Sequence, residues 1–107
     1  MSPDSRIVES VVLPVRPGFE GSFEAAFATA EPLIMRADGY ISHTLRRGIE
    51  NPATYLLSVE WESVEAHEQG FRGSDDYREW TLLLHHFYEP LPQVLHYGAP
   101  MQGSATS

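Results

Sequence analysis

The chain contains no cysteine, few basic residues and no long apolar run. Without cysteine, disulfide frameworks, thiolate nucleophiles and cysteine-ligated metal sites are excluded. The 15 acidic residues outnumber the 7 basic ones, and the net charge of -8 opposes nucleic-acid binding and attraction to anionic membranes. No apolar leader begins the chain and no segment is long enough to span a bilayer. We therefore expect a soluble cytoplasmic protein without nucleic-acid or membrane partners.

Several cofactor signatures are also missing from the chain. It has no glycine-rich phosphate loop, dinucleotide fingerprint, nucleophile elbow or His-Glu-x-x-His zinc motif. The adjacent pair His85 and His86 would point about 100° apart on a helix, so this pair alone cannot hold a metal. The sequence therefore predicts neither a metal nor a cofactor.

A length of 107 residues favours one domain with one core. The ordered domain is predicted over residues 6–98, because the tails 1–5 and 99–107 are small, polar and typical of loose chain ends. Residues 7–15 are rich in valine and end at a Pro-Gly pair, which indicates a strand. From residue 19 a phenylalanine recurs every fourth position, which predicts an amphipathic helix that stops near Gly39.

The second half of the chain repeats this alternation of strand and helix. Two strands, 40–49 and 54–62, are separated by turn-forming residues and predict an antiparallel hairpin. Ser63 and Ser74 are suited to cap two helices, and residues 93–98 are predicted to form the last strand. The order β-α-β-β-α-β is that of an α+β, ferredoxin-like split βαβ fold with a four-stranded antiparallel sheet.

Helices in this plan cover one face of the sheet and leave the other face to be buried by something else. Val11, Leu13, Leu45 and Leu56 offer apolar area for that second face. We expect a homodimer in which two sheets meet through these faces.

Short motifs in the middle of the chain point to a family. The run Val59-Glu60-Trp61-Glu62-Ser63, then Glu65-Ala66-His67, then Ser74-Asp75-x-Tyr77, resembles the antibiotic biosynthesis monooxygenase family, with likeness from Ile7 to Tyr97. The resemblance implies a dimeric α+β barrel with a pocket in each subunit between sheet and helices. It also implies cofactor-independent oxygenation of polycyclic aromatic or quinol-like substrates, or, in one branch, haem degradation.

The haem-degrading branch fits this chain poorly. That branch implies an Asn near Val11 or Val12, a Trp at the end of the short helix and a His one turn into the next helix. Phe71 and Thr81 stand at the last two positions, and no Asn lies on the first strand. His85 and His86 lie one turn further along and keep a metal-based alternative open. Haem degradation is disfavoured.

A cofactor-independent oxygenase requires a base, donors for a substrate anion and a site closed to bulk water. Histidine suits the base because its ordinary pKa lies near neutrality. His67 is the first catalytic candidate because it lies one turn before Phe71, and His86 is the second. His43 is the third and is also assigned to substrate binding. A surface or packing role is the simpler alternative for each of these histidines, and no role is predicted for His96.

Aromatic side chains near these histidines are candidates for the substrate pocket. Tyr77 and Trp80 share one helix face, and Phe71 precedes that helix, so all three are assigned to binding an aromatic ring. Ordinary core packing is the alternative, and it is the stronger interpretation for Tyr88 and Trp61.

The function predicted from the resemblance is a homodimeric, cofactor-independent monooxygenase that acts on a small aromatic, quinol or polyketide-like substrate. Two alternatives stay open at this point. One is a dimer that binds a small molecule without catalysis, and the other is an interaction module whose pocket is filled by its own side chains.

Overall fold

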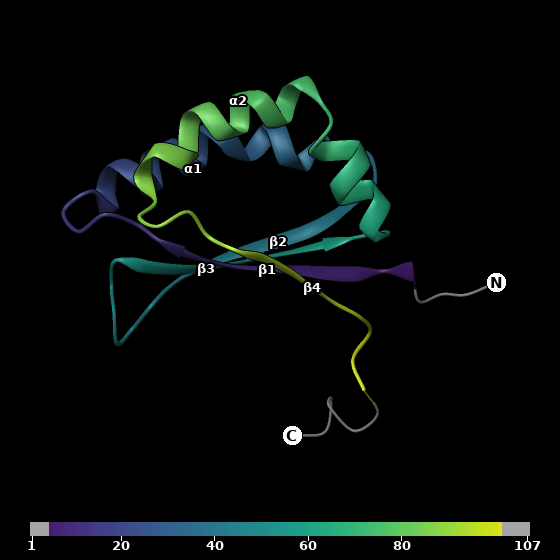
Figure 1. The fold of residues 1–107 in the computed structure, drawn as a ribbon, viewed down its shortest axis with the longest axis horizontal. Helices are drawn as coiled ribbons and strands as arrows, with labels where there is room; N and C mark the ends of the chain where they lie inside the picture. The colour runs from purple at the N-terminus through teal and green to yellow at the C-terminus, as the bar shows by residue number, and fades with distance from the viewer. Residues whose placement is uncertain (1–4, 102–107) are drawn as a thin grey trace.

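The computed structural model describes residues 5–101 and shows two layers, a sheet and the helices that cover one of its faces (Figure 1). Most of both predicted tails, residues 1–4 and 102–107, lies outside the described residues. Within residues 5–101, no helix is long and apolar enough to cross a membrane.

The sheet has four antiparallel strands in the order β2-β3-β1-β4. They are β1 (Ile7–Pro14), β2 (Tyr40–Arg47), β3 (Thr54–Trp61) and β4 (Val94–Tyr97). Each strand lies within one or two residues of its predicted bounds. The two central strands, β1 and β3, are not consecutive in the chain, and this crossover confirms the ferredoxin-like fold.

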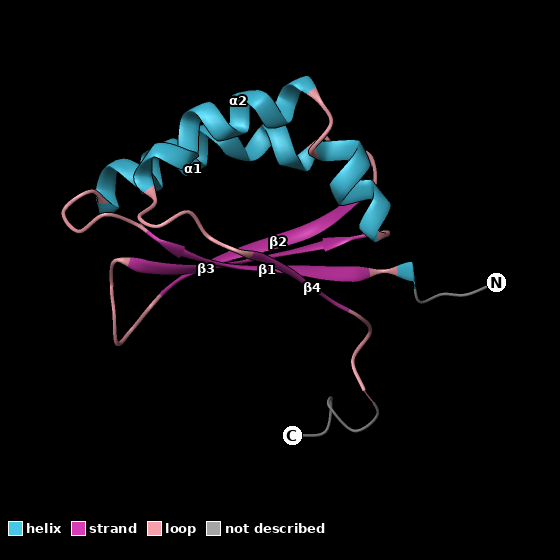
Figure 2. Ribbon diagram, viewed as in Figure 1, coloured by secondary structure: helices cyan, strands magenta, loops and turns pink. Residues whose placement is uncertain are grey.

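Both long helices, α1 (Glu20–Met35) and α2 (Asp75–Leu84), lie on the same face of the sheet (Figure 2). The short helix expected after Ser63 is a π-helical segment, η2 (Ala66–Phe71), and a 3-10 turn, η3 (His85–Phe87), follows α2. The Ser63 Oγ accepts a hydrogen bond from the Ala66 N–H at 3.0 Å, which satisfies one free donor at the start of this segment.

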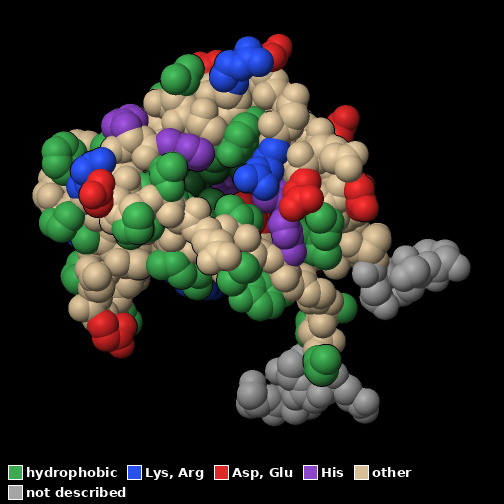
Figure 3. Space-filling view, in the orientation of Figure 1, with side chains coloured by type: hydrophobic (Ala, Val, Ile, Leu, Met, Phe, Trp, Pro, Cys, Tyr) green, Lys and Arg blue, Asp and Glu red, His purple; other side chains and the backbone are tan. Residues whose placement is uncertain are grey.

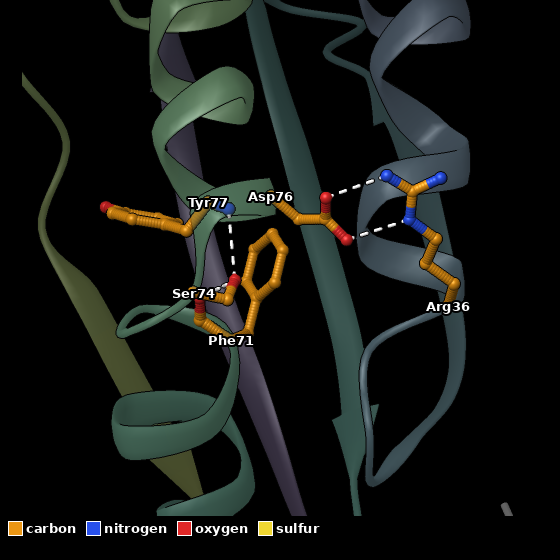
Figure 4. Close-up of polar contacts among 5 residues, drawn as sticks. All are labelled: Arg36, Phe71, Ser74, Asp76 and Tyr77. Atoms are coloured by element: carbon orange, nitrogen blue, oxygen red, sulfur yellow. Dashed lines mark hydrogen bonds and ion pairs between the residues drawn. The ribbon is translucent and has the colours of Figure 1, made fainter.

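The start of α2 is held by two sets of polar contacts (Figure 4). Ser74 is its N-cap, and its Oγ accepts from the Tyr77 N–H at 3.1 Å, as the sequence predicted. The guanidinium of Arg36, just after α1, donates to both carboxylate oxygens of Asp76 at 2.8 and 2.7 Å. This two-point contact ties the end of α1 to the start of α2.

Gly39 is required by both backbone conformation and space. Its φ of +86° lies in the left-handed region, and a Cβ built on it would stand 2.5 Å from the Ala66 Cβ. The turn into β2 can therefore pass under η2 only with glycine at this position.

Strand alternation decides which side chains face the helices. Val11 and Leu13 point toward the helices and are each only 3% exposed, whereas Val12 is 56% exposed on the opposite face. Leu45 packs against the core, and Leu56 is 38% exposed. The expectation that Val11, Leu13 and Leu45 lie on the open face is therefore wrong. Successive side chains of a strand point to opposite faces of the sheet, and these three point to the face that the helices cover.

The open face carries an apolar set of its own, which we call the outer patch. Its members share exposure on the face opposite the helices and come from β1, β3 and β4. They are Val12, Leu56, Leu95 and Tyr97, with exposed fractions of 56%, 38%, 46% and 53%.

Candidate active site

A cavity of about 240 Å³ lies between the sheet and the helices, among β1, β3, β4, η2 and α2. Figure 3 shows a hollow on one face of the molecule, with hydrophobic side chains around it and basic, acidic and histidine side chains beside it. The apolar walls are formed by side chains from strands and helices, namely Val11, Leu13, Ile34, Leu57 and Val94. An interaction module with a filled pocket would lack this space.

Glu9 is the one carboxylate among the cavity-lining residues, and it lies on β1 at a helix-facing position with 6% exposure. The Trp61 Nε1–H donates to the Glu9 Oε1 at 2.9 Å. Burial raises the pKa of Glu9 above its ordinary value, while the Trp61 hydrogen bond and the Arg72 charge oppose this shift. A buried carboxylate with a raised pKa is a better proton acceptor than one at the surface.

His67 lies on η2 beside Glu9 and is almost fully buried. Its Nε2 lies 3.4 Å from the Glu9 Oε1, its Nδ1 shares a hydrogen bond of 2.9 Å with the His96 Nε2, and its ring stacks on Trp61 at 5.2 Å. Burial, and then the charges of His96 and Arg72, lower the pKa of His67 to about 4. The imidazole is therefore neutral near pH 7, with one of its two ring nitrogens unprotonated.

Arg72 and His85 bring further polar character to the cavity wall. Arg72 is an exposed residue, and no carboxylate of residues 5–101 lies within ion-pair distance of its guanidinium. Burial, followed by the Arg72 charge, lowers the pKa of His85. Arg72 thus provides positive charge at the cavity without a carboxylate partner that would neutralise it.

The aromatic side of the cavity is formed by three of the residues assigned from the sequence, Phe71, Tyr77 and Trp80. The Phe71 ring meets Tyr77 and Trp80 edge to face, at centroid distances of 5.4 and 5.7 Å. Tyr88 also lines the cavity, and burial raises the pKa of its hydroxyl. These rings provide flat apolar contacts, with two phenolic groups for orientation.

The other two assigned histidines lie away from the cavity. His86 is exposed on η3, and its ring packs on Phe87 at 4.2 Å. His43, on β2, shares hydrogen bonds with the Tyr40 hydroxyl and, at 2.7 Å, with Glu31. The Phe27 ring contacts both His43 and Trp80, at 6.0 and 5.7 Å, so it stands between His43 and the aromatic wall.

Sequence reasoning missed Glu9, Arg72, His85 and His96. One signal was available, since Glu9 interrupts an apolar series at alternate positions of β1, where a charged side chain must be buried. His96 could be found only from strand pairing, because it lies directly opposite Glu9 in the β1–β4 ladder. Trp61, which was expected to be structural, orients Glu9 and stacks on His67.

A second hollow, of about 210 Å³, lies beside the Arg36–Asp76 pair at the start of α2. Three of its four polar side chains, Arg36, Ser74 and Asp76, already bind one another or the backbone (Figure 4), and the fourth is Asp38. Within residues 5–101, no three His, Asp or Glu side chains are grouped so as to hold a metal ion.

Comparison with known proteins links this architecture to one family. Residues 6–81 match the family model described as antibiotic biosynthesis monooxygenase. The uncharacterized protein YczJ of Bacillus subtilis (strain 168) is 48% identical over 89 residues, which cover 83% of this chain and 94% of that protein.

Solved structures show the same fold. The crystal structure of a candidate antibiotic biosynthesis monooxygenase from Bordetella bronchiseptica has 42% identity and a TM-score of 0.85, over 90% of this chain and 98% of that one. SnoaB, a cofactor-independent oxygenase from Streptomyces nogalater, has a TM-score of 0.72 at 18% identity, over 95% of this chain and 98% of that one. At such low identity, SnoaB is similar in fold alone.

Proposed function

Because the chain belongs to the antibiotic biosynthesis monooxygenase family, we propose that it oxygenates a small phenol or quinol with molecular oxygen and without a cofactor. One observation carries this proposal: a buried pair of proton acceptors, Glu9 and His67, opens into a cavity with aromatic walls. SnoaB, which shares the fold, acts without a cofactor.

The chemistry depends on removing a proton from the substrate. A phenolate is electron-rich enough to react with oxygen, whereas the neutral phenol is not. The phenolate and oxygen form a peroxide anion at a ring carbon. A returned proton converts this anion to a hydroperoxide, which then loses water to leave a carbonyl. One oxygen atom enters the ring, the other leaves as water with two hydrogens of the substrate, and no external reductant is consumed.

The residues of the cavity match these needs. The Glu9–His67 pair accepts the hydroxyl proton, and the guanidinium of Arg72 stabilises the anion that forms. Phe71, Tyr77 and Trp80 hold the ring and displace water from around it. His43 and His86 take no part in this scheme, because neither lines the cavity.

The cavity volume narrows the substrate class. At about 240 Å³ it exceeds the roughly 150 Å³ of an engineered cavity that binds benzene. It is smaller than the roughly 300 Å³ at which pockets for drug-sized ligands begin. We infer a substrate of one or two fused rings in preference to a polycyclic, polyketide-like one. A haem also exceeds this volume, which agrees with the poor fit to the haem-degrading branch.

We also propose that the protein is a homodimer joined through the outer patch. Val12 and Leu56 lie opposite each other in the β1–β3 ladder, so their side chains form one contiguous apolar area on the open face. Placing a charge there with Val12→Asp should convert the dimer into a monomer, measured by sedimentation velocity. An unchanged mass for this variant, or a monomeric wild type, would contradict the assembly.

Oxygen consumption tests the proposed activity. We expect uptake with hydroquinone and 1,4-naphthohydroquinone above the spontaneous rate measured with heat-denatured protein, and less uptake with the tricyclic anthrone. If none of these compounds is consumed faster than the blank while 1-naphthol still binds by calorimetry, the protein is a binding protein and not an oxygenase.

Two histidine substitutions locate the base. His67→Gln should lower turnover by about 10²- to 10⁴-fold, because a glutamine amide cannot take up a proton. His86→Gln should leave turnover unchanged, because that side chain lies outside the cavity. A large loss in His86→Gln together with little loss in His67→Gln would reverse the assignment.

A further inference from the structure

Four titratable side chains form a row from the cavity to the surface. They belong to three elements, β1, η2 and β4. The inner two side chains are buried, with exposures of 8% for Glu9 and 4% for His67, and the outer two are more exposed, with 20% for His96 and 48% for Glu68. We propose that Glu9, His67, His96 and Glu68 form a proton pathway that links the cavity to solvent. This inference rests on the proposed function, because it explains where the substrate proton goes.

One contact in the row is a hydrogen bond, and the other two lie within ion-pair distance. The Glu9 Oε1 lies 3.4 Å from the His67 Nε2, and the His67 Nδ1 lies 2.9 Å from the His96 Nε2. The other nitrogen of His96, Nδ1, lies 4.0 Å from the Glu68 Oε2 at the surface, where water also reaches the ring. Each imidazole therefore has one nitrogen toward the cavity side and one toward the solvent side.

Imidazole can conduct a proton because one nitrogen accepts while the other donates. A proton that arrives at the His67 Nε2, directly or from Glu9, allows the proton on Nδ1 to move to the His96 Nε2. His96 then releases its own Nδ1 proton to Glu68 or to water. Each step breaks one N–H or O–H bond and forms one, so protons are conserved. The reverse sequence returns one proton to the peroxide anion, which becomes the hydroperoxide before water is lost.

The site needs such a route because a bound ring closes the direct one. The wall around Glu9 and His67 is otherwise largely apolar, and a ring that fills the cavity displaces the water that would carry a proton away. The other charged or titratable groups that face this space are Arg72, His85 and the hydroxyls of Tyr77 and Tyr88. Arg72 repels a proton on His67, which favours movement away from the cavity toward His96.

The sheet itself sets the spacing of the row. Glu9 and His96 are direct partners in the antiparallel β1–β4 ladder, so both side chains point to the same face of the sheet. The His67 side chain extends from η2 toward the sheet and contacts both of them. Trp61 holds the inner end, through its hydrogen bond to Glu9 and its stacking on the His67 ring.

A first experiment needs no substrate. In protein labelled with ¹⁵N-histidine, a hydrogen bond between the His67 Nδ1 and the His96 Nε2 should give a measurable nitrogen–nitrogen coupling across it. The absence of this coupling would overturn the pathway, whatever the protein does with quinols.

A second experiment measures proton movement with 4-nitrophenol, whose phenolate is coloured. Stopped-flow mixing in weak buffer follows two signals, the bound phenolate and a pH-indicator dye that reports protons released to solution. In His96→Gln we expect the phenolate amplitude to be unchanged and the dye signal to be about 10- to 100-fold slower. Imidazole added to the solution should restore the rate, because it can replace the missing ring.

Glu68→Gln should slow proton release less than His96→Gln does. The control for Glu68→Gln is Glu65→Gln, which changes another exposed glutamate near η2. Release at the wild-type rate in His96→Gln would overturn the pathway, and so would a wild-type protein that releases no proton from the phenol. If release follows the expected pattern while no quinol consumes oxygen, the pathway stands and the oxygenase function fails.

Discussion

Two regions of the space between the helices and the sheet are rich in aromatic side chains, yet one is packed and the other encloses a cavity. In the packed region, which we call the Phe23 cluster, the fully buried Phe23 ring meets the rings of Phe27, Tyr55, Phe87 and Tyr88 at 4.8–5.9 Å. In the other, Phe71, Tyr77 and Trp80 surround about 240 Å³ of space. Aromatic content alone does not distinguish them.

The difference lies in the ionisable groups that face inward. In the Phe23 cluster, the Tyr55 hydroxyl donates to the Glu24 carboxylate at 2.6 Å at a part-buried site. The cavity instead contains Glu9 and His67, which must keep polar partners because a buried charge without them is costly. Among residues 5–101, no buried side-chain nitrogen or oxygen lacks a hydrogen-bond partner. An apolar cluster can close completely, whereas a site with buried acids and bases keeps room beside them.

The largest expected effect on stability comes from emptying the packed region. Phe23→Ala should lower the free energy of unfolding by about 3–5 kcal/mol, because it removes a fully buried ring and leaves a void among four other rings. Urea unfolding followed by circular dichroism measures this loss. A cost below about 1 kcal/mol would show that the Phe23 cluster is not tightly packed.

Trp61→Phe tests the polar support of the cavity. It removes the N–H that donates to Glu9 and leaves a buried carboxylate with one partner fewer, so stability should fall by about 1–3 kcal/mol. It should also raise the pKa of Glu9 further, measured by the pH dependence of its side-chain ¹³C shift. If that pKa does not move, the indole is not the group that holds Glu9.

Adding volume should cost more stability in the packed region than in the hollow one. Ala30→Leu enlarges a fully buried position of α1 and should cost about 1–3 kcal/mol. Val94→Phe places the added atoms in existing space, so stability should change by less than about 1 kcal/mol while calorimetric binding of 1-naphthol is lost. Equal destabilisation by the two substitutions would break the distinction between packed and hollow regions.

The pH dependence of stability gives the most specific test. The pKa of His67 is about 4 in the folded protein and 6.5 ordinarily, so between these values the unfolded chain takes up a proton that the folded one does not. Stability should therefore fall as the pH is lowered from 6.5 to 4. The raised pKa of Glu9 acts in the opposite direction, because the folded state then holds its proton more strongly than the unfolded chain.

Comparing wild type with His67→Gln isolates the histidine contribution, since Glu9 is common to both. The unfolding free energy of the variant should depend less steeply on pH in this window, measured by urea unfolding at several pH values. A variant as steep as the wild type would place the titrating group elsewhere.

Much of the site could be predicted from local sequence, and the remainder could not. His67 and Phe71 were found because they lie one turn apart in a segment that Ser63 starts, and Tyr77 and Trp80 because they follow the Ser74 cap. His86 was chosen ahead of His85 without a means to distinguish them, since the helical register that turns His85 inward depends on the 3-10 turn after α2.

The sequence by itself determined the order of strands and helices, their caps and turns, the single core and the family. These follow from periodicity, capping chemistry and motifs that act over a few residues. Only the tertiary structure decided that Glu9, His67 and His96 meet, because their contact depends on β4 pairing with β1 and on η2 lying above that pair. It also decided which alternate residues of β1 face the helices, and hence that Val12 belongs to the outer patch while Val11 and Leu13 do not.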